Sequence, residues 1–249
     1  MEFLCVALVC LAFLVVIGCV FPIKMKKIKE LGERPELDEI ANGYPSNVEM
    51  CKEYLKKLGN EDVQVEEDKE ATATMYIAVL NKIKIANLKQ NYTRIQTMAH
   101  ECIHSIQNKK IVMFHFIISN LFFVFFAVIS ILALFKKLPN EMMFFVILSI
   151  LGFVYAWVRC YLENDAMTRA WYLAKEYLEE KQRCSNFCNV VSGDKEIKTE
   201  EESILSNENV EKLLDAYKEL NEIGIPCVNY QVLFSMFSKI LIFAIICLW

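Results

Sequence analysis

Two of the three histidines in this chain lie four residues apart, in the stretch HECIH at residues 100–104. The stretch has the pattern H-E-x-x-H. On a helix, His100 and His104 point to the same side, so that both imidazoles can bind one metal ion. Glu101 lies beside them and can act as the general base on a metal-bound water. The alternative is a pair of structural histidines that flank a glutamate by chance. The pattern predicts a site for one zinc ion with hydrolytic chemistry.

The third ligand that a catalytic zinc site needs lies outside this stretch. Lys110 stands where a metzincin would have its third histidine, so that subclass is excluded. His115 falls several residues into an apolar stretch, and we expect it to pack within a helix bundle or to face the membrane interface. Among the carboxylates, Glu163 is the best candidate, because a membrane hairpin would return it to the face that holds His104. The alternative role of Glu163 and Asp165 is to favour a helix N-terminus electrostatically.

Asp165 follows the candidate third ligand by two residues. A carboxylate that accepts an N–H from a ligating imidazole fixes the tautomer of that imidazole and strengthens it as a donor. We expect Asp165 to have this role.

The hydrophobic residues, 55% of the chain, are concentrated in four blocks that are long enough to span a bilayer as helices. The predicted transmembrane helices are residues 3–23, 111–135, 142–158 and 228–249. Positive charge favours the cytoplasmic side, so the lysines after the first block and before the second place residues 24–110 inside. Arg159 and the basic residues after it place residues 160–226 inside as well, whereas Lys136 and Lys137 in the short outer loop oppose this orientation.

The segments outside these blocks contain shorter elements. Ser46 and Glu49 form a capping box that opens a helix, and Gly59 closes it. Gly224 and Pro226 are expected to end the last helix before the final span. We expect strands at residues 63–65, 73–79 and 82–86, a hairpin turn at Leu80-Asn81, and helices at residues 91–108, 163–181 and 207–222. The predicted fold class is a mainly α membrane protein with a small β-sheet, in which four transmembrane helices carry a zincin-like cytoplasmic catalytic portion.

Composition excludes other classes of protein. The high apolar content and the modest net charge of −4 exclude disorder. The sequence also lacks the basic stripe that is typical of nucleic-acid-binding proteins. The ten cysteines are scattered without the spacing of a disulfide framework, which is typical of a reducing location. Cys184 and Cys188 are interpreted as free thiols near a loop, with half of a metal site as the alternative.

The motif and its surroundings resemble a known family. Residues 98–107, MAHECIHSIQ, are similar to the A-H-E-x-x-H-x-x-Q segment of the neutral zinc metallopeptidases of bacterial membranes (the YugP-like group). Residues 163–166, followed by Arg169, resemble that family's E-F-D-A-S-x-R segment after a transmembrane hairpin, although Ile103 replaces the glycine that usually precedes the second histidine. The order of anchor, motif, hairpin, acidic segment and final span also agrees, so the resemblance covers nearly the whole chain. It implies a gluzincin-type peptidase of the bacterial cell membrane, with the zinc ligands His100, His104 and Glu163 and the catalytic base Glu101.

The predicted function is therefore that of a membrane-anchored zinc endopeptidase, whose partners are a protein or peptide substrate and the lipid bilayer. An extended substrate would add to the edge of a predicted strand formed by Lys82, Ile83, Lys84 and Ile85. One alternative is a zinc-binding or metal-free membrane scaffold that does not cleave; the intact Glu101 argues against it, because a structural site has no need of that carboxylate. A second alternative is cleavage within the membrane, and the polar helix at residues 91–108 argues against that placement.

Overall fold

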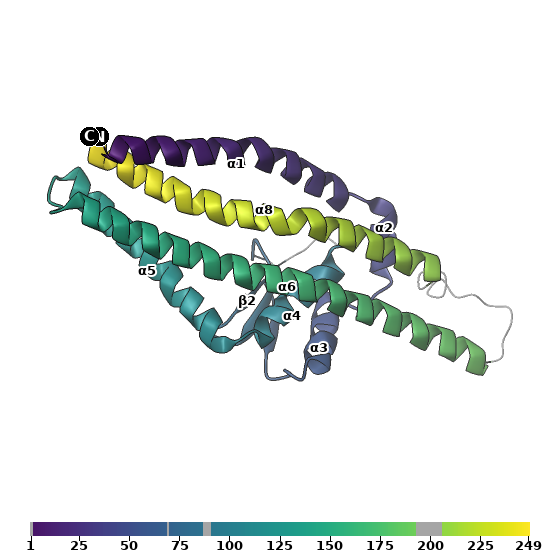
Figure 1. Ribbon diagram of the computed structural model, residues 1–249. Coiled ribbons are helices and arrows are strands. Elements are labelled where there is room, and N and C mark those ends of the chain that lie inside the picture. Colours follow the sequence, from purple (N-terminus) through teal and green to yellow (C-terminus); the bar gives the residue numbers. More distant parts are fainter. Residues whose placement is uncertain (1, 69, 87–90, 193–205) are drawn as a thin grey trace. The chain divides into compact units, whose positions relative to one another are not determined.

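The computed structural model of the chain describes residues 2–68, 70–86, 91–192 and 206–249; the side chains of residues 22, 23 and 185–192 lie outside this description. Its helices are α1 (Glu2–Gly32), α2 (Pro35–Asn42), α3 (Asn47–Lys57), α4 (Arg94–Ile106), α5 (Lys109–Leu134), α6 (Glu141–Ser192) and α8 (Asn207–Leu248) (Figure 1). Its strands are β1 (Gln64–Asp68), β2 (Met75–Ile77) and β3 (Lys82–Ala86). The prediction of a mainly helical protein with a small sheet is thereby confirmed.

The chain folds into two compact units, each built from separate segments. The first unit comprises Met1–Lys26, Asn108–Glu163 and Ile225–Trp249. The second unit comprises Lys27–Gln107 and Asn164–Gly224. Each unit has its own core of buried apolar side chains.

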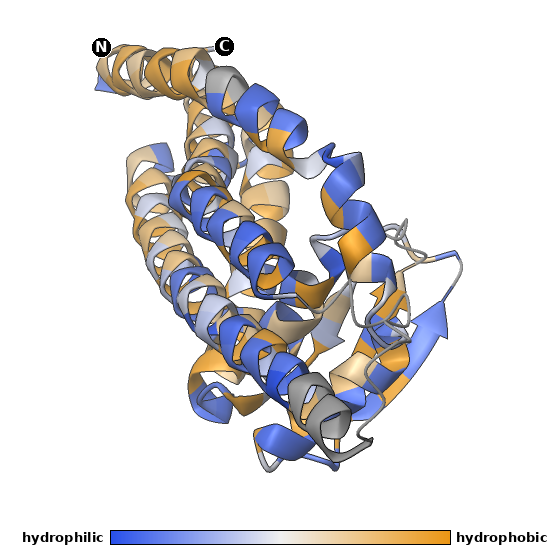
Figure 2. Cartoon of the chain, turned by 90° about the vertical axis from the view of Figure 1, so that its right-hand side faces the viewer, coloured by the Kyte–Doolittle hydropathy of each residue, from blue (hydrophilic) through white to orange (hydrophobic). Residues whose placement is uncertain are grey.

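Four helices are long and apolar enough to cross a membrane, as in a multi-pass membrane protein. They are Glu2–Gly32, Lys109–Leu134, Glu141–Cys184 and Asn207–Leu248. In α1, apolar residues predominate from the N-terminus, and hydrophilic residues follow toward its C-terminal end (Figure 2). The spans expected from the sequence coincide with these helices, except that residues 135 and 249 lie one position beyond the ends of α5 and α8. Where the spans begin and end in a membrane stays a prediction.

Aromatic side chains and one glycine bring the helices of the first unit together. Phe13 of α1 stacks on Phe237 of α8 with a centroid distance of 5.0 Å. At Gly152 of α6 a Cβ atom would lie 3.1 Å from Phe122 of α5 and 3.1 Å from Met236 of α8. A larger residue at this position would require the side chains of Phe122 and Met236 to shift by a few tenths of an ångström.

Two predicted helix ends are wrong. The sequence suggested a helix that begins at Glu163, but α6 runs unbroken from Glu141 through this residue (Figure 1). The same holds for α8, which continues through Pro226 although proline removes a backbone N–H and costs about 3 kcal/mol inside a helix. Packing on both sides of the proline overrides this local preference, because Tyr217 is buried in the core of the second unit and Phe243 in that of the first.

The sheet of the second unit has the strand order β1-β3-β2. β1 pairs with β3 in parallel, and β2 pairs with β3 in the antiparallel direction. The hairpin turn before β3 is confirmed at Asn81, which has a φ of 49°. The alternation in β3 is confirmed too, since Ile83 and Ile85 are buried. β3 is nevertheless the central strand, so the prediction that Lys82, Ile83, Lys84 and Ile85 form a substrate-binding edge is wrong. β1 pairs with all four residues on one side, and β2 pairs with Lys82, Ile83 and Lys84 on the other.

The helix α3 begins and ends as the sequence indicates. The Ser46 side chain accepts a hydrogen bond from the Glu49 backbone N–H, and the Glu49 carboxylate accepts one from the Ser46 backbone N–H. Gly59 follows the C-cap with a φ of 65°, a conformation that glycine adopts without a steric penalty. Both ends are therefore set by residues within one helical turn.

A buried arginine ties the N-terminal part of α4 to the segment before α3. The Arg94 guanidinium donates hydrogen bonds to the carbonyls of Ala41, Tyr44 and Pro45 and to the side chain of Asn47. Carbonyl oxygens near a helix C-terminus carry partial negative charge, which offsets the cost of burying the cation. This contact fixes the start of the helix that carries the H-E-x-x-H motif.

Candidate metal centre

The helix α4 holds both histidines of the motif on one side. Met98, Ala99, Cys102 and Ile103 are buried in the core, while the two imidazoles are only half-buried on the remaining face. The Nε2 atoms of His100 and His104 lie 3.0 Å apart, with the rings at 89° to one another. Two imidazole nitrogens on one tetrahedral zinc ion would lie about 3.3 Å apart, so the pair fits with a small rotation of either ring.

Glu163 of α6 completes the group. One potential ligand atom from each of His100, His104 and Glu163 lies within 4.8 Å of the others, and in the described part of the chain this is the group that could hold a metal ion. Glu163 is buried, and its Oε1 atom lies 2.6 Å from the Arg159 guanidinium one turn earlier in α6. Because Glu163 lies in the middle of a helix, the interpretation of this residue as a helix N-terminal charge is excluded. Two imidazoles and one carboxylate are a donor set of catalytic zinc sites.

Gln107 connects His104 to Asp165. The Gln107 Nε2 group donates a hydrogen bond to Asp165 Oδ2 over 2.8 Å, and the Gln107 Oε1 atom lies 2.8 Å from His104 Nδ1. An ionised carboxylate only accepts hydrogen bonds, so Asp165 must face the amide NH₂ and the amide oxygen must face the imidazole. His104 therefore carries its proton on Nδ1 and directs the lone pair of Nε2 toward His100.

This arrangement corrects the expected contact of Asp165. Its carboxylate accepts from Gln107 and lies 3.6 Å from the Arg169 guanidinium, so it reaches the imidazole through the glutamine amide and not directly. The contact of Gln107 with His104 was not predicted from the sequence. A signal was available, because a spacing of three residues places both side chains on one side of the chain at the end of α4.

The candidate base Glu101 contacts the sheet. The backbone N–H of Tyr76, in β2, donates a hydrogen bond of 2.6 Å to Glu101 Oε2. This N–H points away from β3, because its bond goes to the carboxylate and not to the neighbouring strand. A main-chain donor carries no side-chain signal, so the sequence could not reveal this partner.

The other histidine and the cysteines lie outside this group. His115 stacks on Tyr155 with a centroid distance of 5.8 Å, which agrees with its expected packing in the helix bundle. Cys102 lies next to Glu101 in sequence, but burial raises the pKa of its thiol well above the ordinary value, so it does not offer a metal-binding thiolate. Cys184 is an exposed free thiol, and the side chain of Cys188 lies outside the described residues.

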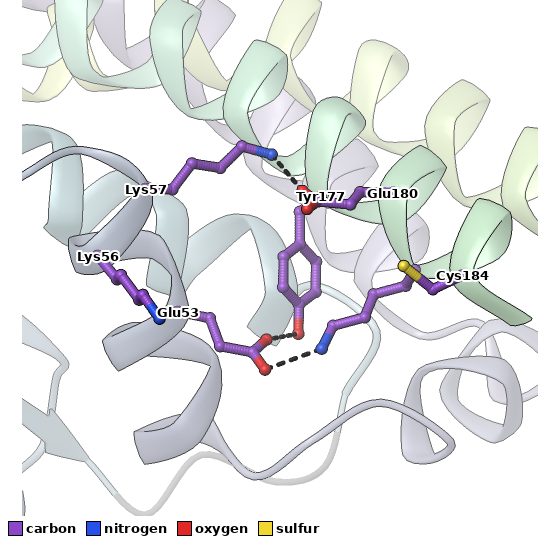
Figure 3. A pocket seen from close by; sticks show the side chains of 7 residues that line it. Glu53, Lys56, Lys57, Tyr177, Glu180 and Cys184 are labelled. Carbon is purple, nitrogen blue, oxygen red and sulfur yellow. Dashed lines mark hydrogen bonds and ion pairs between the residues drawn. The ribbon is translucent and has the colours of Figure 1, made fainter.

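A separate pocket of about 450 Å³ is lined by residues of α3 and α6 (Figure 3). Glu53 at this pocket accepts a hydrogen bond of 2.6 Å from the Tyr177 hydroxyl and one of 2.8 Å from Lys181. Lys57 lies 2.6 Å from Glu180. These contacts join the two helices, and the pocket shares no lining residue with the candidate metal ligands.

Comparisons with family models, with curated proteins and with solved structures found no match for this chain.

Proposed function

We propose that this protein is a membrane-anchored, zinc-dependent endopeptidase, related to the neutral zinc metallopeptidases that its motifs resemble. One observation carries the proposal: the potential ligand atoms of His100, His104 and Glu163 come within 4.8 Å of one another, beside the buried carboxylate of Glu101. A structural site would have no need of this neighbouring carboxylate. The donor set therefore supports a hydrolytic site.

A zinc ion held by these three residues would supply Lewis-acid activation of a water molecule and of the scissile carbonyl. Glu101 is placed to take the proton of the attacking water and to pass it to the leaving amine. The Tyr76 N–H fixes one oxygen of this carboxylate, which keeps the base oriented during both transfers. Gln107 and Asp165 hold His104 in the tautomer that ligation requires.

The substrate strand would add to β2 and not to β3. β2 is the terminal strand of the sheet on the side opposite β1, so one of its edges faces away from β3. The Tyr76 N–H on that edge donates a hydrogen bond to Glu101, so this edge of β2 lies next to the candidate base. An extended peptide that lies along this edge would pass close to Glu101, although the Tyr76 N–H itself is already bonded to that carboxylate.

The proposed location is a bacterial cell membrane with the catalytic residues at the cytoplasmic face. Four apolar helices support the membrane assignment. The orientation follows from the lysines at positions 24, 26, 27 and 29 after the first apolar block, because positive charge favours the cytoplasmic side.

The test compares the purified full chain with the Glu101→Gln and His104→Gln variants, with zinc content and casein cleavage as readouts. We expect about one zinc per chain in the wild type and in Glu101→Gln, and a loss of cleavage in Glu101→Gln of about 10²-fold or more. His104→Gln should lose both zinc and cleavage. Equal cleavage by wild type and Glu101→Gln would contradict the role of the base. Zinc retained without cleavage by the wild type would indicate the scaffold alternative.

A further inference from the structure

Two buried thiols are in contact between α3 and α4, the helix that carries the histidines. The Sγ atoms of Cys51, in α3, and Cys102, in α4, lie 3.4 Å apart, although the residues are separated by 51 positions in sequence. Both side chains have an exposed fraction of 0%. The Cys102 Sγ also lies 3.6 Å from the Cys51 carbonyl oxygen, so the two helices are in close contact at this point.

The thiol pair is distinct from the candidate metal centre. Cys102 is two residues away from each histidine, and two residues correspond to a rotation of about 200° around an α-helix. Its side chain therefore leaves α4 on the side opposite the imidazoles, in the core against α3. Nothing in the proposed hydrolysis uses either sulfur.

We propose that Cys51 and Cys102 form a reversible disulfide that fastens the metal-binding helix to α3. The sulfur atoms of a disulfide are about 2.05 Å apart, so bond formation needs an approach of roughly 1.4 Å. The two side chains would close this gap by rotation together with a small adjustment of the helices. Because the inference depends only on the packing of α3 and α4, it holds whether or not the chain is a peptidase.

The oxidant that the proposal requires belongs to the class of peroxides, and hydrogen peroxide is the probe. The Cys51 thiol gives up its proton, its sulfur attacks a peroxide oxygen, and the O–O bond breaks, so that the leaving hydroxide takes up the proton and Cys51 becomes a sulfenic acid with release of one water. The Cys102 sulfur, 3.4 Å away, then attacks the sulfenic sulfur of Cys51, and the hydroxyl group leaves as water with the proton that the Cys102 thiol gives up in the same step. In sum, the two thiols lose two hydrogens and two electrons, and the peroxide is reduced to two waters.

The disulfide would enclose the segment that contains β1, β2 and β3, because these strands lie between Cys51 and Cys102 in the chain. A cross-link of this kind restricts the unfolded chain and disfavours opening of the enclosed segment. The strand β2, which contacts Glu101, would then be held in an oxidised protein by a covalent bond in addition to its packing.

The experiment treats the full chain in detergent with hydrogen peroxide, blocks the remaining thiols, and maps linked peptides by mass spectrometry. We expect a peptide pair joined through Cys51 and Cys102, lighter by two hydrogens than the thiol forms and separated again by dithiothreitol. We also expect limited proteolysis between residues 51 and 102 to slow by about 10-fold or more on oxidation.

Two single variants and one control complete the design. Cys51→Ser and Cys102→Ser should abolish the linked pair and the change in proteolysis, whereas Cys184→Ser, which alters an exposed thiol of the same unit, should leave both unchanged. Recovery of Cys51 and Cys102 as thiols, while Cys184 is oxidised, would overturn the proposal. The wild-type measurement decides the matter even where a serine variant fails to fold.

Discussion

Gln107 donates a hydrogen bond of 2.8 Å to Asp165, and through its other end it orients His104. In Gln107→Leu the imidazole loses the acceptor that holds its Nδ1 proton, and we expect zinc affinity to fall about 10- to 100-fold. Asp165→Asn should weaken the binding less, because an asparagine oxygen can still accept from the glutamine. Competition with a zinc chelator measures both affinities. Arg169→Gln, which alters only the distal partner of Asp165, is the matched control, and unchanged affinity in Gln107→Leu would contradict the orienting role.

Glu163 supplies the only carboxylate in the candidate ligand group of the described residues. Glu163→Gln keeps the size of the side chain but removes its charge, and we expect a larger loss of zinc affinity than in Gln107→Leu, because a ligand and not its partner is altered. Cobalt substitution gives an independent readout, since its visible spectrum depends on the number of ligands. Arg159→Gln, which removes the neighbouring guanidinium, should leave cobalt coordination in place. An unaltered spectrum in Glu163→Gln would exclude this residue as a ligand.

Tyr76 offers a test of a single main-chain contact. Because its N–H points to Glu101 and not to β3, Tyr76→Pro removes that hydrogen bond without the loss of a bond within the sheet. We expect cleavage to fall by about 10-fold or more with zinc content unchanged, since the base loses its orienting donor. Tyr76→Ala is the control, because it removes the side chain and keeps the N–H. Equal activity of both variants would show that the contact has no role in catalysis.

Arg94 is buried, no carboxylate among the described residues pairs with it, and its guanidinium donates to three carbonyl oxygens. Arg94→Met would leave these acceptors without their donor, and we expect a loss of about 3 kcal/mol or more in the free energy of unfolding. Arg34→Met removes a partly exposed pair with Glu219 and should cost at most about 1 kcal/mol. Denaturant unfolding of the full chain in detergent compares the two variants, and equal losses would contradict the importance of burial.

Gly152 and Gly18 form a matched pair within apolar helices. A Cβ at Gly152 would lie 3.1 Å from Phe122 and Met236, whereas one at Gly18 would meet nothing within 4 Å. We expect Gly152→Ala to destabilise the first unit by about 1–3 kcal/mol through overpacking. Gly18→Ala should be neutral or stabilising, because alanine favours a helix by up to about 1 kcal/mol. Thermal unfolding of both variants in the same detergent measures whether their stability changes in opposite directions. A loss of stability in both variants would contradict the prediction.

Several features followed directly from short stretches of sequence. The capping box of Ser46 and Glu49, the turn at Gly59 and the common face of His100 and His104 all depend on residues within four positions of each other. Such contacts are determined by helix geometry and by local hydrogen bonding, and the structure contains each of them. The apolar blocks could also be predicted from local sequence, because their length and hydropathy are enough to identify them.

Other features required the tertiary structure. The order of the strands, which places β3 in the centre, depends on a parallel pairing with β1 that no local pattern specifies. The continuation of α8 through Pro226 depends on packing along both of its halves, and the contact of Cys51 with Cys102 joins positions far apart in the chain. Residue types and short spacings were therefore enough to indicate the residues that could bind a metal ion and the helices that could cross a membrane. The place of Gln107 between His104 and Asp165 depends on the tertiary structure, because burial and long-range hydrogen bonding select that partner from many polar residues.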